Sequence, residues 1–500
     1  MAAGVPHFLR VAAVVSDCGW RELELVDMAE GFDVAGLKKA FRSGKTRGID
    51  WRKAQLGAIR RFLAENEAQI FEALKQDLGK HPVEAYRDEI GVVKKSADHA
   101  LLHIDKWMAP KKSKLPLLLF PSRAQVLPEP LGVALDPLIG AISAGNTVVI
   151  KPSELAPACS SLLKRIIPHY LDAEAVKIIE GGSDVAEQLL QQRWDKIFFT
   201  GSPRVGHIVM SAAAKHLTPV TLELGGKCPV ILDSLSGSDL KVAVKRIAGG
   251  KWGPCAGQAC IGIDYLLVQQ NLAPLLVESL KSCIKRFYGE NMETLQSICR
   301  IVNKHHFDRI CILLGEPGVA ASIVYGGSVD PENLVIEPTI LMDPPLDAQI
   351  MTEEIFGPLL PIITLDKIEE SIDFINERPK PLAIYAFTKN KKLKDQILHE
   401  TSSGNVTFND TIIQFICETL PFGGIGQSGF GRYHGKYSFD TFSHEKAVLD
   451  RSFFPELEPR YPPWNDFKLE FIRLAFNLDY VGLLLLLLGL RRIFMPNWSR

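Results

Sequence analysis

Two residues of types that perform covalent catalysis lie in glycine-rich segments of the chain. Cys260 ends the segment Gly257-Gln258-Ala259-Cys260, and Glu223 lies in Leu222-Glu223-Leu224-Gly225-Gly226-Lys227. A thiol attacks an electrophile as its thiolate, so it requires a group that takes its proton. A carboxylate at a strand end can be this base, and the two glycines after it let other backbone approach closely. Because most cysteines are small buried hydrophobic residues, the pair alone remains a hypothesis for covalent catalysis.

The segments that must position these residues show two kinds of pattern. Apolar residues at helical spacing cover residues 34–108, and residues 110–130, rich in proline and lysine, predict an extended connector. From Val133 onward, short β-branched runs alternate with helical segments; the runs are Thr147–Ile150, Val176–Ile179, Lys196–Phe199 and Val220–Leu222. This alternation, which continues in a second stretch from Val230 to about Thr401, predicts an α/β fold with parallel sheets that bind nucleotides at their strand ends.

The composition limits the class of protein. A chain of 500 residues exceeds one ordinary domain, so two or more lobes are expected. The 57 basic and 58 acidic residues nearly balance, which argues against a nucleic-acid partner bound by a basic face. The nine cysteines are scattered without zinc spacing, so we expect no metal site and reduced thiols in a cytoplasmic protein.

The two ends of the chain carry different signals. Residues 1–27 form an extension whose apolar part is too short for a secretory signal, and its role stays open. The tail contains an apolar run over 480–490, with six consecutive leucines, followed by Arg491 and Arg492. A bilayer span requires roughly 20 apolar residues, so this run is short for one. It is either a helix packed on its own protein or on a partner subunit, or a membrane-surface anchor through residues 480–492.

Several segments resemble motifs of the aldehyde dehydrogenase superfamily, in particular its class 3 branch. The segments around Glu223 and Cys260 are similar to its two active-site signatures. Six further segments resemble family motifs and occur along the chain in the family's order; they are residues 151–154, 199–206, 354–358, 420–424, 428–436 and 442–444. The likeness extends from about Gly31 to Leu449. It implies a Rossmann-type parallel-sheet cofactor domain, an α/β catalytic domain, a small oligomerisation arm and a homodimer.

The resemblance also implies an activity, the oxidation of aldehydes to carboxylic acids with NAD or NADP. Cys260 would be the nucleophile that forms a thiohemiacetal and, after hydride transfer to the nicotinamide, a thioester. Glu223 would be the general base for the thiol or for the hydrolytic water. Some class 3 relatives carry hydrophobic tails, which favours attachment to the surface of the endoplasmic reticulum as a further hypothesis.

The cofactor-binding residues implied by the resemblance are Lys151, Glu154, Gly201, Ser202, Val205, Gly206, Glu354 and Phe356. Residues 201–206 follow a strand and open a helix, where backbone amides suit a pyrophosphate. Lys151 would bind the ribose hydroxyls, and Glu154 would favour NAD because a 2′-phosphate would meet a like charge. Glu354 and Phe356 would hold the nicotinamide ribose. Phe422 would line the nicotinamide or aldehyde pocket, with a core aromatic as the alternative, and His434 has no role that follows from the sequence.

The chain departs from the family pattern between Leu135 and Asp136. About a dozen residues with a Trp-Asn-aromatic-Pro motif are absent there, and that asparagine is the family's oxyanion donor. Losing one such donor costs about 10²- to 10³-fold in rate, so impaired activity is expected. The alternative is a catalytically weak or inactive member that acts as a partner subunit or membrane-associated scaffold. Asp136 is expected to cap a short helix that ends at Ala144.

These observations predict five regions. They are the extension 1–27, a helical region with the cofactor domain over 28–222, the catalytic domain over 223–404, a return to the cofactor and bridging region over 405–449, and the tail over 450–500.

Overall fold

The computed structural model describes residues 12–15, 34–113, 123–130, 135–454 and 456–490. Residues 131–134 on one side of the expected gap, most of the extension 1–27, and Arg491 and Arg492 lie outside the described residues. The chain divides into two compact units. The larger comprises residues 1–107 and 130–444, and the smaller comprises residues 108–129 and 445–500.

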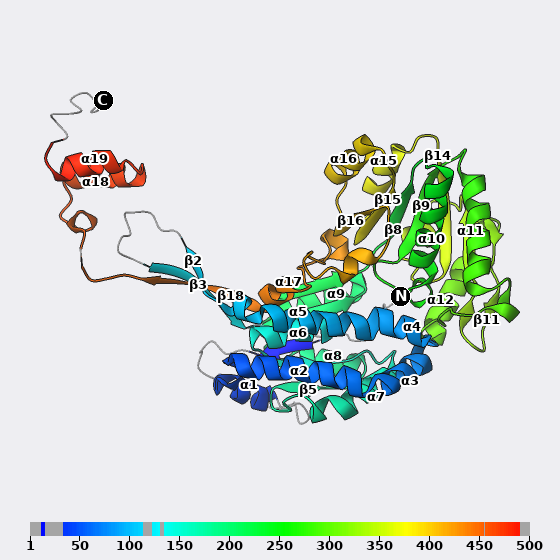
Figure 1. Cartoon of the computed structure of the whole chain (residues 1–500), viewed down its shortest axis with the longest axis horizontal. Helices are drawn as coiled ribbons and strands as arrows, with labels where there is room; N and C mark the ends of the chain where they lie inside the picture. The colour runs from blue at the N-terminus through cyan, green and yellow to red at the C-terminus, as the bar shows by residue number, and fades with distance from the viewer. Residues whose placement is uncertain (1–11, 16–33, 114–122, 131–134, 455, 491–500) are drawn as a thin grey trace. The chain divides into compact units, whose positions relative to one another are not determined.

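The larger unit begins with a layer of helices, as the apolar spacing predicts (Figure 1). They are α1 (Val34–Arg42), α2 (Ile49–Glu65), α3 (Glu67–Leu78), α4 (Pro82–Ala85) and α5 (Gly91–Met108), with a π-helical turn η2 (Tyr86–Ile90) between the last two. On α2, Leu56, Ile59 and Phe62 form the buried face. Helix α3 ends at Gly79, whose φ of 68° suits glycine at a helix C-terminus.

A six-stranded sheet lies beside these helices, in the order β17-β7-β6-β1-β4-β5. Its parallel pairs are β4 (Thr147–Ile150) with β5 (Val176–Ile178), and β6 (Lys196–Gly201) with β7 (Val220–Leu224). Strand β17 (Gly429–Phe430) runs antiparallel to β7. The connecting helices are α6 (Leu135–Ala144), α7 (Pro157–Ile166), α8 (Ser183–Leu190) and α9 (Pro203–Ala214). The β-branched runs of the sequence therefore form the predicted crossover sheet.

The strand in the middle of this sheet comes from the N-terminal extension. Strand β1 (Ala12–Val15) lies between β4 and β6, antiparallel to both, and pairs with four residues of β4 and three of β6. A vacant position there would leave the facing edges of β4 and β6 without backbone partners. Part of the extension, whose role the sequence left open, thus completes the sheet.

The helix after the expected gap differs slightly from the prediction. Helix α6 ends at Ala144 as expected, but it begins at Leu135, so Asp136 lies in its first turn. The expectation that Asp136 caps this helix is wrong. Its carboxylate instead lies 3.5 Å from Nε2 of His434, and one of its oxygens accepts no hydrogen bond from the described residues.

The second sheet has seven strands in the order β10-β13-β14-β9-β8-β15-β16, all parallel to their neighbours except β10. The strands are β8 (Cys228–Leu232), β9 (Ile263–Gln269), β10 (Ile323–Tyr325), β13 (Thr339–Met342), β14 (Leu359–Leu365), β15 (Ala383–Phe387) and β16 (Asn405–Phe408). Helices α10 (Gly237–Trp252) and α11 (Ala273–Tyr288) pack against each other, and α10 contacts β9 (Figure 1). Apolar side chains such as Leu266 and Leu267 alternate between two buried clusters, so both faces of the sheet are covered.

Shorter elements complete the larger unit. They are α12 (Lys304–Gly315), α13 (Pro317–Ala320), β11 (Val329–Asp330), β12 (Val335–Ile336), α14 (Gln349–Thr352), α15 (Glu370–Asn376), α16 (Lys391–Glu400) and α17 (Lys436–Thr441). Strand β16 belongs to the second sheet, so that sheet extends four residues past the boundary expected at residue 404. The expected domain boundaries stay a prediction.

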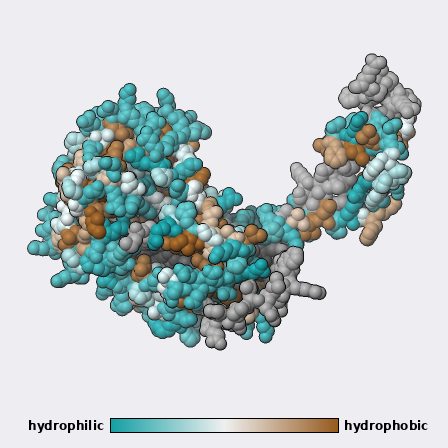
Figure 2. Space-filling view, turned by 180° about the vertical axis from the view of Figure 1, so that it is seen from behind, coloured by the Kyte–Doolittle hydropathy of each residue, from teal (hydrophilic) through white to brown (hydrophobic). Residues whose placement is uncertain are grey.

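The smaller unit contains a three-stranded sheet in the order β18-β3-β2 and a pair of helices. The strands are β2 (Lys111–Ser113), β3 (Arg123–Pro130) and β18 (Ser443–Asp450), so much of the expected connector is β-structure. The helices α18 (Asp466–Phe476) and α19 (Tyr480–Leu487) pack together, and brown apolar residues show on the surface of this part (Figure 2). Among the described helices, none combines the length and the apolar character needed to cross a bilayer.

Candidate active site

Cys260 lies in a strained turn that connects α10 to β9. Cys255, Ala256 and Gly257 all adopt left-handed backbone conformations, with φ of 50°, 54° and 81°. A Cβ atom at Gly257 would lie 2.4 Å from the carbonyl oxygen of Gly357, so this position accepts only glycine. The glycine of the cysteine signature therefore serves a tight approach between the turn and the segment that follows Glu354. Strain of this kind persists where the surrounding structure holds it in place.

Gln258 holds the turn through hydrogen bonds at both ends of its side chain. Its Nε2 donates to the carbonyl oxygens of Cys255 at 2.7 Å and Arg300 at 3.1 Å, and its Oε1 accepts from the backbone N–H of Val302 at 3.0 Å. The side chain is fully buried, so these bonds fix the approach to Cys260.

Apolar and weakly polar groups surround Cys260 itself, which is 5% exposed. The thiol of Cys228 donates to the carbonyl oxygen of Cys260 at 3.4 Å, and the hydroxyl of Tyr385 donates to the carbonyl oxygen of Ile261 at 2.7 Å. Phe422 belongs to the same buried cluster as Cys260. This agrees with both alternatives for Phe422, a pocket wall and a core aromatic, so its role stays a prediction.

Glu223 lies on β7, opposite Gly429 of β17, and is 3% exposed. Neither carboxylate oxygen has a hydrogen-bond partner among the described residues. Burial raises the pKa of Glu223 well above its usual value of 4.5. A carboxylate with a raised pKa and no competing partner is suited to accept a proton near neutral pH.

Tyr433 brings Glu223 and Cys260 into one neighbourhood. Tyr433 packs against the buried cluster that contains Cys260. Burial raises the pKa of its phenol, and the charge of Glu223 raises it further. Backbone hydrogen bonds of 3.0 and 2.8 Å pair Tyr433 with Phe422. Residues that are far apart in the sequence therefore converge at this point.

His434 is packed in the protein core. Its ring stacks on Phe422, with 5.2 Å between centroids and 16° between planes, and it is completely buried. Burial lowers the pKa of His434 to about 4, against the opposing effect of the Glu418 charge. The imidazole is therefore neutral near pH 7 and acts as a packing element.

A cavity of about 440 Å³ at the ends of β4 and β6 contains most of the expected cofactor residues. Lys151, Glu154, Gly201, Ser202 and Val205 line it. The ammonium of Lys151 donates to Glu154 at 2.7 Å and to the carbonyl of Pro152 at 3.2 Å.

The helix start in this cavity fits a pyrophosphate. Ser202 caps α9 by accepting from the backbone N–H of Val205 at 3.4 Å, and the helix has 12 residues. Gly206 does not line the cavity; a Cβ there would lie 3.1 Å from Cδ2 of Leu224, so Gly206 allows α9 to pack on β7. Gly201, Ser202 and Val205 of this motif therefore line the cavity, whereas Gly206 allows the helix to pack.

A second cavity, of about 620 Å³, contains Glu354 and shares Ser202 and Arg204 with the first. A Cβ on Gly225 would lie 2.2 Å from Oε2 of Glu354, so the carboxyl rests directly against the glycine backbone. Burial raises the pKa of Glu354 to about 8, and the charge of Asp264 adds to this effect. Phe356 does not line this cavity but lies in the buried cluster around Cys260.

The sequence did not reveal the ion pair that ties these segments together. Lys227 pairs with Asp264, and its ammonium also donates to the carbonyls of Ile350 at 2.8 Å and Glu353 at 3.0 Å. The other Asp264 oxygen accepts from the backbone N–H of Ile355 at 2.9 Å. The sequence indicates this ion pair only through the position of Lys227, which ends the segment that contains Glu223.

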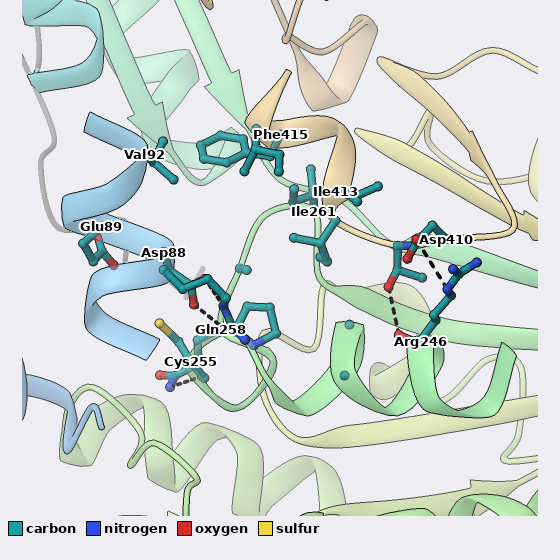
Figure 3. Close-up of a pocket in the computed structure, with 18 of the residues that line it drawn as sticks. Asp88, Glu89, Val92, Arg246, Cys255, Gln258, Ile261, Asp410, Ile413 and Phe415 are labelled. Carbon is teal, nitrogen blue, oxygen red and sulfur yellow. Dashed lines mark hydrogen bonds and ion pairs between the residues drawn. The ribbon is translucent and has the colours of Figure 1, made fainter. Parts of the chain in front are cut away.

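A third cavity, of about 360 Å³, reaches both neighbours of Cys260, Ala259 and Ile261 (Figure 3). Its walls come from residues 80–92, from α10, from the cysteine turn and from the loop 410–416. The loop contributes apolar side chains such as Ile413 and Phe415, which no sequence motif marked. This cavity has the position and the apolar lining expected for an aldehyde chain.

The comparisons with known proteins agree with this arrangement. The family model described as "Aldehyde dehydrogenase family" matches residues 33–448. The chain belongs to the aldehyde dehydrogenase family. It is 59% identical over 470 residues to aldehyde dehydrogenase family 3 member F1 of Arabidopsis thaliana, covering 91% of this chain and 97% of that protein. It is 43% identical to family 3 member A2 of Mus musculus, covering 90% and 96%.

Solved structures show the same fold. The substrate-bound state of Staphylococcus aureus AldH superimposes with a TM-score of 0.85 at 41% identity, over 88% of this chain and 98% of that one. An indole-3-acetaldehyde dehydrogenase in complex with NAD⁺ gives a TM-score of 0.74 at 25% identity, over 84% and 88%. The resemblance to class 3 and the predicted fold are confirmed. The assigned roles of the individual site residues stay predictions.

Proposed function

We propose that this chain oxidises aldehydes to carboxylic acids with NAD or NADP, through a covalent intermediate on Cys260. The observation that carries the proposal is the buried Glu223 carboxylate, which has no hydrogen-bond partner among the described residues, together with a cavity that reaches both neighbours of Cys260. The family membership and the NAD⁺ complex of a structural relative support it.

The proposed reaction begins when Glu223 takes the proton of Cys260 and the thiolate attacks the aldehyde carbon, which forms a thiohemiacetal. A nicotinamide held by the cofactor residues would supply the hydride acceptor, and loss of the hydride would leave a thioester on Cys260. Glu223 then releases its first proton to solvent and takes a proton from a water that attacks the thioester. The carbon–sulfur bond breaks to release the acid, and Glu223 returns its proton to the Cys260 thiolate. The raised pKa of Glu223 fits both proton transfers.

The cofactor is proposed to extend across the two cavities that share Ser202 and Arg204. The amides at the start of α9 would bind the pyrophosphate, and Lys151 and Glu154 would bind the adenosine ribose. Glu354 would hold the nicotinamide ribose. Phe356 would act on that ribose only indirectly, because it lies in the adjacent core.

We further propose that the turnover of this chain is weak. The segment with the family's oxyanion asparagine is absent between Leu135 and Asp136. Strand β1 supplies backbone pairing in the sheet, but its sequence Ala-Ala-Val-Val contains no asparagine. A loss of one donor corresponds to a rate lower by about 10²- to 10³-fold. The rival hypothesis of an inactive partner subunit or scaffold predicts no Cys260-dependent turnover at all.

The experiment compares three purified proteins with NAD or NADP and a medium-chain aldehyde. They are the chain as it is, the chain with the missing family segment restored, and the restored chain with Cys260→Ser. We expect slow NADH formation from the first, at least about a hundredfold faster formation from the second, and none from the third. Equal rates from the first two would refute the impairment, and an inactive restored chain would refute the activity.

The tail supports a second, separate proposal, attachment of a cytoplasmic homodimer to the surface of the endoplasmic reticulum. Leu484, Leu487 and Leu488 of the α19 segment are each more than half exposed. Such side chains can enter the headgroup boundary while the helix lies along the surface. Alkaline carbonate extraction of the full chain and of a chain ending at residue 465 tests it, since only the former should remain with membranes.

A further inference from the structure

Outside the proposed mechanism, two cysteines and a glutamate form a compact buried cluster. One carboxylate oxygen of Glu84 and the sulfur atoms of Cys255 and Cys299 lie within 4.8 Å of one another. Glu84 belongs to α4, Cys255 to the strained turn, and Cys299 to an irregular segment before α12. All three are buried, and the catalytic steps use none of them.

The hydrogen bonds of the cluster give the Cys299 proton an acceptor, although the neighbouring Cys255, burial and the Glu84 charge raise the pKa of the Cys299 thiol. Its thiol donates to both carboxylate oxygens of Glu84 at 3.2 Å, while one of these oxygens also accepts from the backbone N–H of Cys255 at 2.8 Å. Burial raises the pKa of Glu84, so this carboxylate is a better proton acceptor than an exposed one.

A buried cation lies beside Cys255. Lys80 is 2% exposed and forms an ion pair with Glu89 at 2.5 Å. Burial opposes the charge of Lys80, but the negative charges of Cys255 and Glu89 outweigh it and raise the pKa of Lys80. Lys80 and Cys255 line the same cavity, so a positive charge lies near the Cys255 sulfur.

The cluster is accessible from the cavity next to Cys260. Lys80, Glu89 and Cys255 line that cavity, and Figure 3 shows the Cys255 sulfur on the same side as Glu89. A small oxidant that enters by the aldehyde route therefore meets Cys255 before it meets the more deeply placed Cys299. The two sulfur atoms lie within 4.8 Å of each other, and a disulfide requires them to approach to about 2.05 Å, so the turn that carries Cys255 must shift when the bond forms.

We propose that Cys255 and Cys299 form a reversible disulfide when hydrogen peroxide enters this cavity. The Cys255 thiolate attacks one peroxide oxygen, the O–O bond breaks, and the departing hydroxide takes a proton to become water. Glu84 takes the proton of Cys299, whose thiolate attacks the sulfenic sulfur of Cys255. The S–S bond forms, and the second hydroxide leaves with the Glu84 proton as water, so two thiols and one peroxide give one disulfide and two waters.

The disulfide has a consequence for Cys260, which lies five residues after Cys255. Closing the bond draws the strained turn toward Cys299 by as much as about 2.8 Å, the difference between 4.8 Å and the S–S length. A displacement of about 1 Å at a reacting group can cost about a hundredfold in rate. We therefore expect iodoacetamide to alkylate Cys260 at least about tenfold more slowly in the oxidised protein.

A bound divalent metal is the other use of such a cluster. Three ligand atoms are one fewer than a structural zinc site requires. The ammonium of Lys80 near Cys255 also repels a cation, so the charges favour a thiol pair over a metal site.

The experiment treats the full chain with hydrogen peroxide, digests it without reductant and identifies linked peptides by mass spectrometry. A Cys260→Ala version of the chain undergoes the same treatment, which separates the result from any catalytic activity. We expect a Cys255–Cys299 link in both, its reversal by dithiothreitol, and slowed alkylation of Cys260 in the unsubstituted chain.

Two variants serve as controls. Cys299→Ser should abolish both the link and the slowed alkylation, whereas Cys283→Ser, which removes another buried thiol from α11, should leave both unchanged. Absence of the link in folded protein would overturn the proposal. A link from Cys255 to Cys260, or zinc retained by the reduced chain through dialysis and lost in Cys299→Ser, would also overturn it.

Discussion

Replacing Glu354 with glutamine should make the protein more stable at alkaline pH while weakening cofactor binding. The carboxyl lies against the backbone of Gly225, and burial raises its pKa from 4.5 to about 8. Above pH 4.5 the unfolded chain releases this proton, but the folded protein retains it until about pH 8. The folded state therefore loses stability across this range, and glutamine, which is neutral throughout, does not.

The size of the effect follows from the two pKa values. A tenfold difference in proton affinity corresponds to about 1.4 kcal/mol, so a pKa of about 8 in place of 4.5 costs at most about 5 kcal/mol. This penalty is absent below pH 4.5, grows as the pH rises, and is complete above about pH 8. Glu354→Gln should therefore match the unsubstituted chain near pH 4.5 and exceed its stability above pH 8. The gain stays below this upper limit because the side chain is only half-buried and lines a cavity, where solvent screens its charge.

Urea titrations at several pH values between 5 and 9 measure the difference directly. The control is Glu353→Gln, which makes the same substitution at the exposed neighbouring residue, whose carboxylate accepts a hydrogen bond from Gln349 at 3.0 Å. A difference for Glu354→Gln that stays constant with pH would refute the reasoning, because it would arise from packing instead of a desolvated charge. Weaker NAD binding by the same variant, measured calorimetrically, would support its proposed ribose contact.

Three further perturbations test other parts of the structure. Deleting residues 1–27 removes β1 and should lower the free energy of unfolding by several kcal/mol, at about 1 kcal/mol for each lost hydrogen bond. The same deletion should have no such effect in a chain with the family segment restored. Gly201→Ala places a Cβ 2.3 Å from Phe199 and should raise the Kd for NAD at least about tenfold, whereas Gly315→Ala meets nothing within 4 Å and should not. Gln258→Leu leaves buried groups unpaired and should lower the unfolding free energy by about 1–3 kcal/mol for each, measured by urea titration.

Much of the architecture follows from local patterns in the sequence. The β-branched runs became strands β4 to β7 because alternation and branching are properties of neighbouring residues. The turn before Cys260 likewise depends on local geometry, since Gly257 adopts a φ of 81°, which favours glycine. These features depend on a few consecutive residues, so the sequence by itself determined them.

Other features depend on which distant segments meet, and only the tertiary structure decided them. Strand β1 lies between β4 and β6 because that position lacked a backbone partner, and nothing within residues 12–15 encodes this. Glu84 meets Cys255 and Cys299 across more than 170 residues, and the loop 410–416 lines the cavity beside Cys260. Local propensity determines where helices and strands form. Long-range contacts stabilise the protein only when the chain folds and buries the groups that meet.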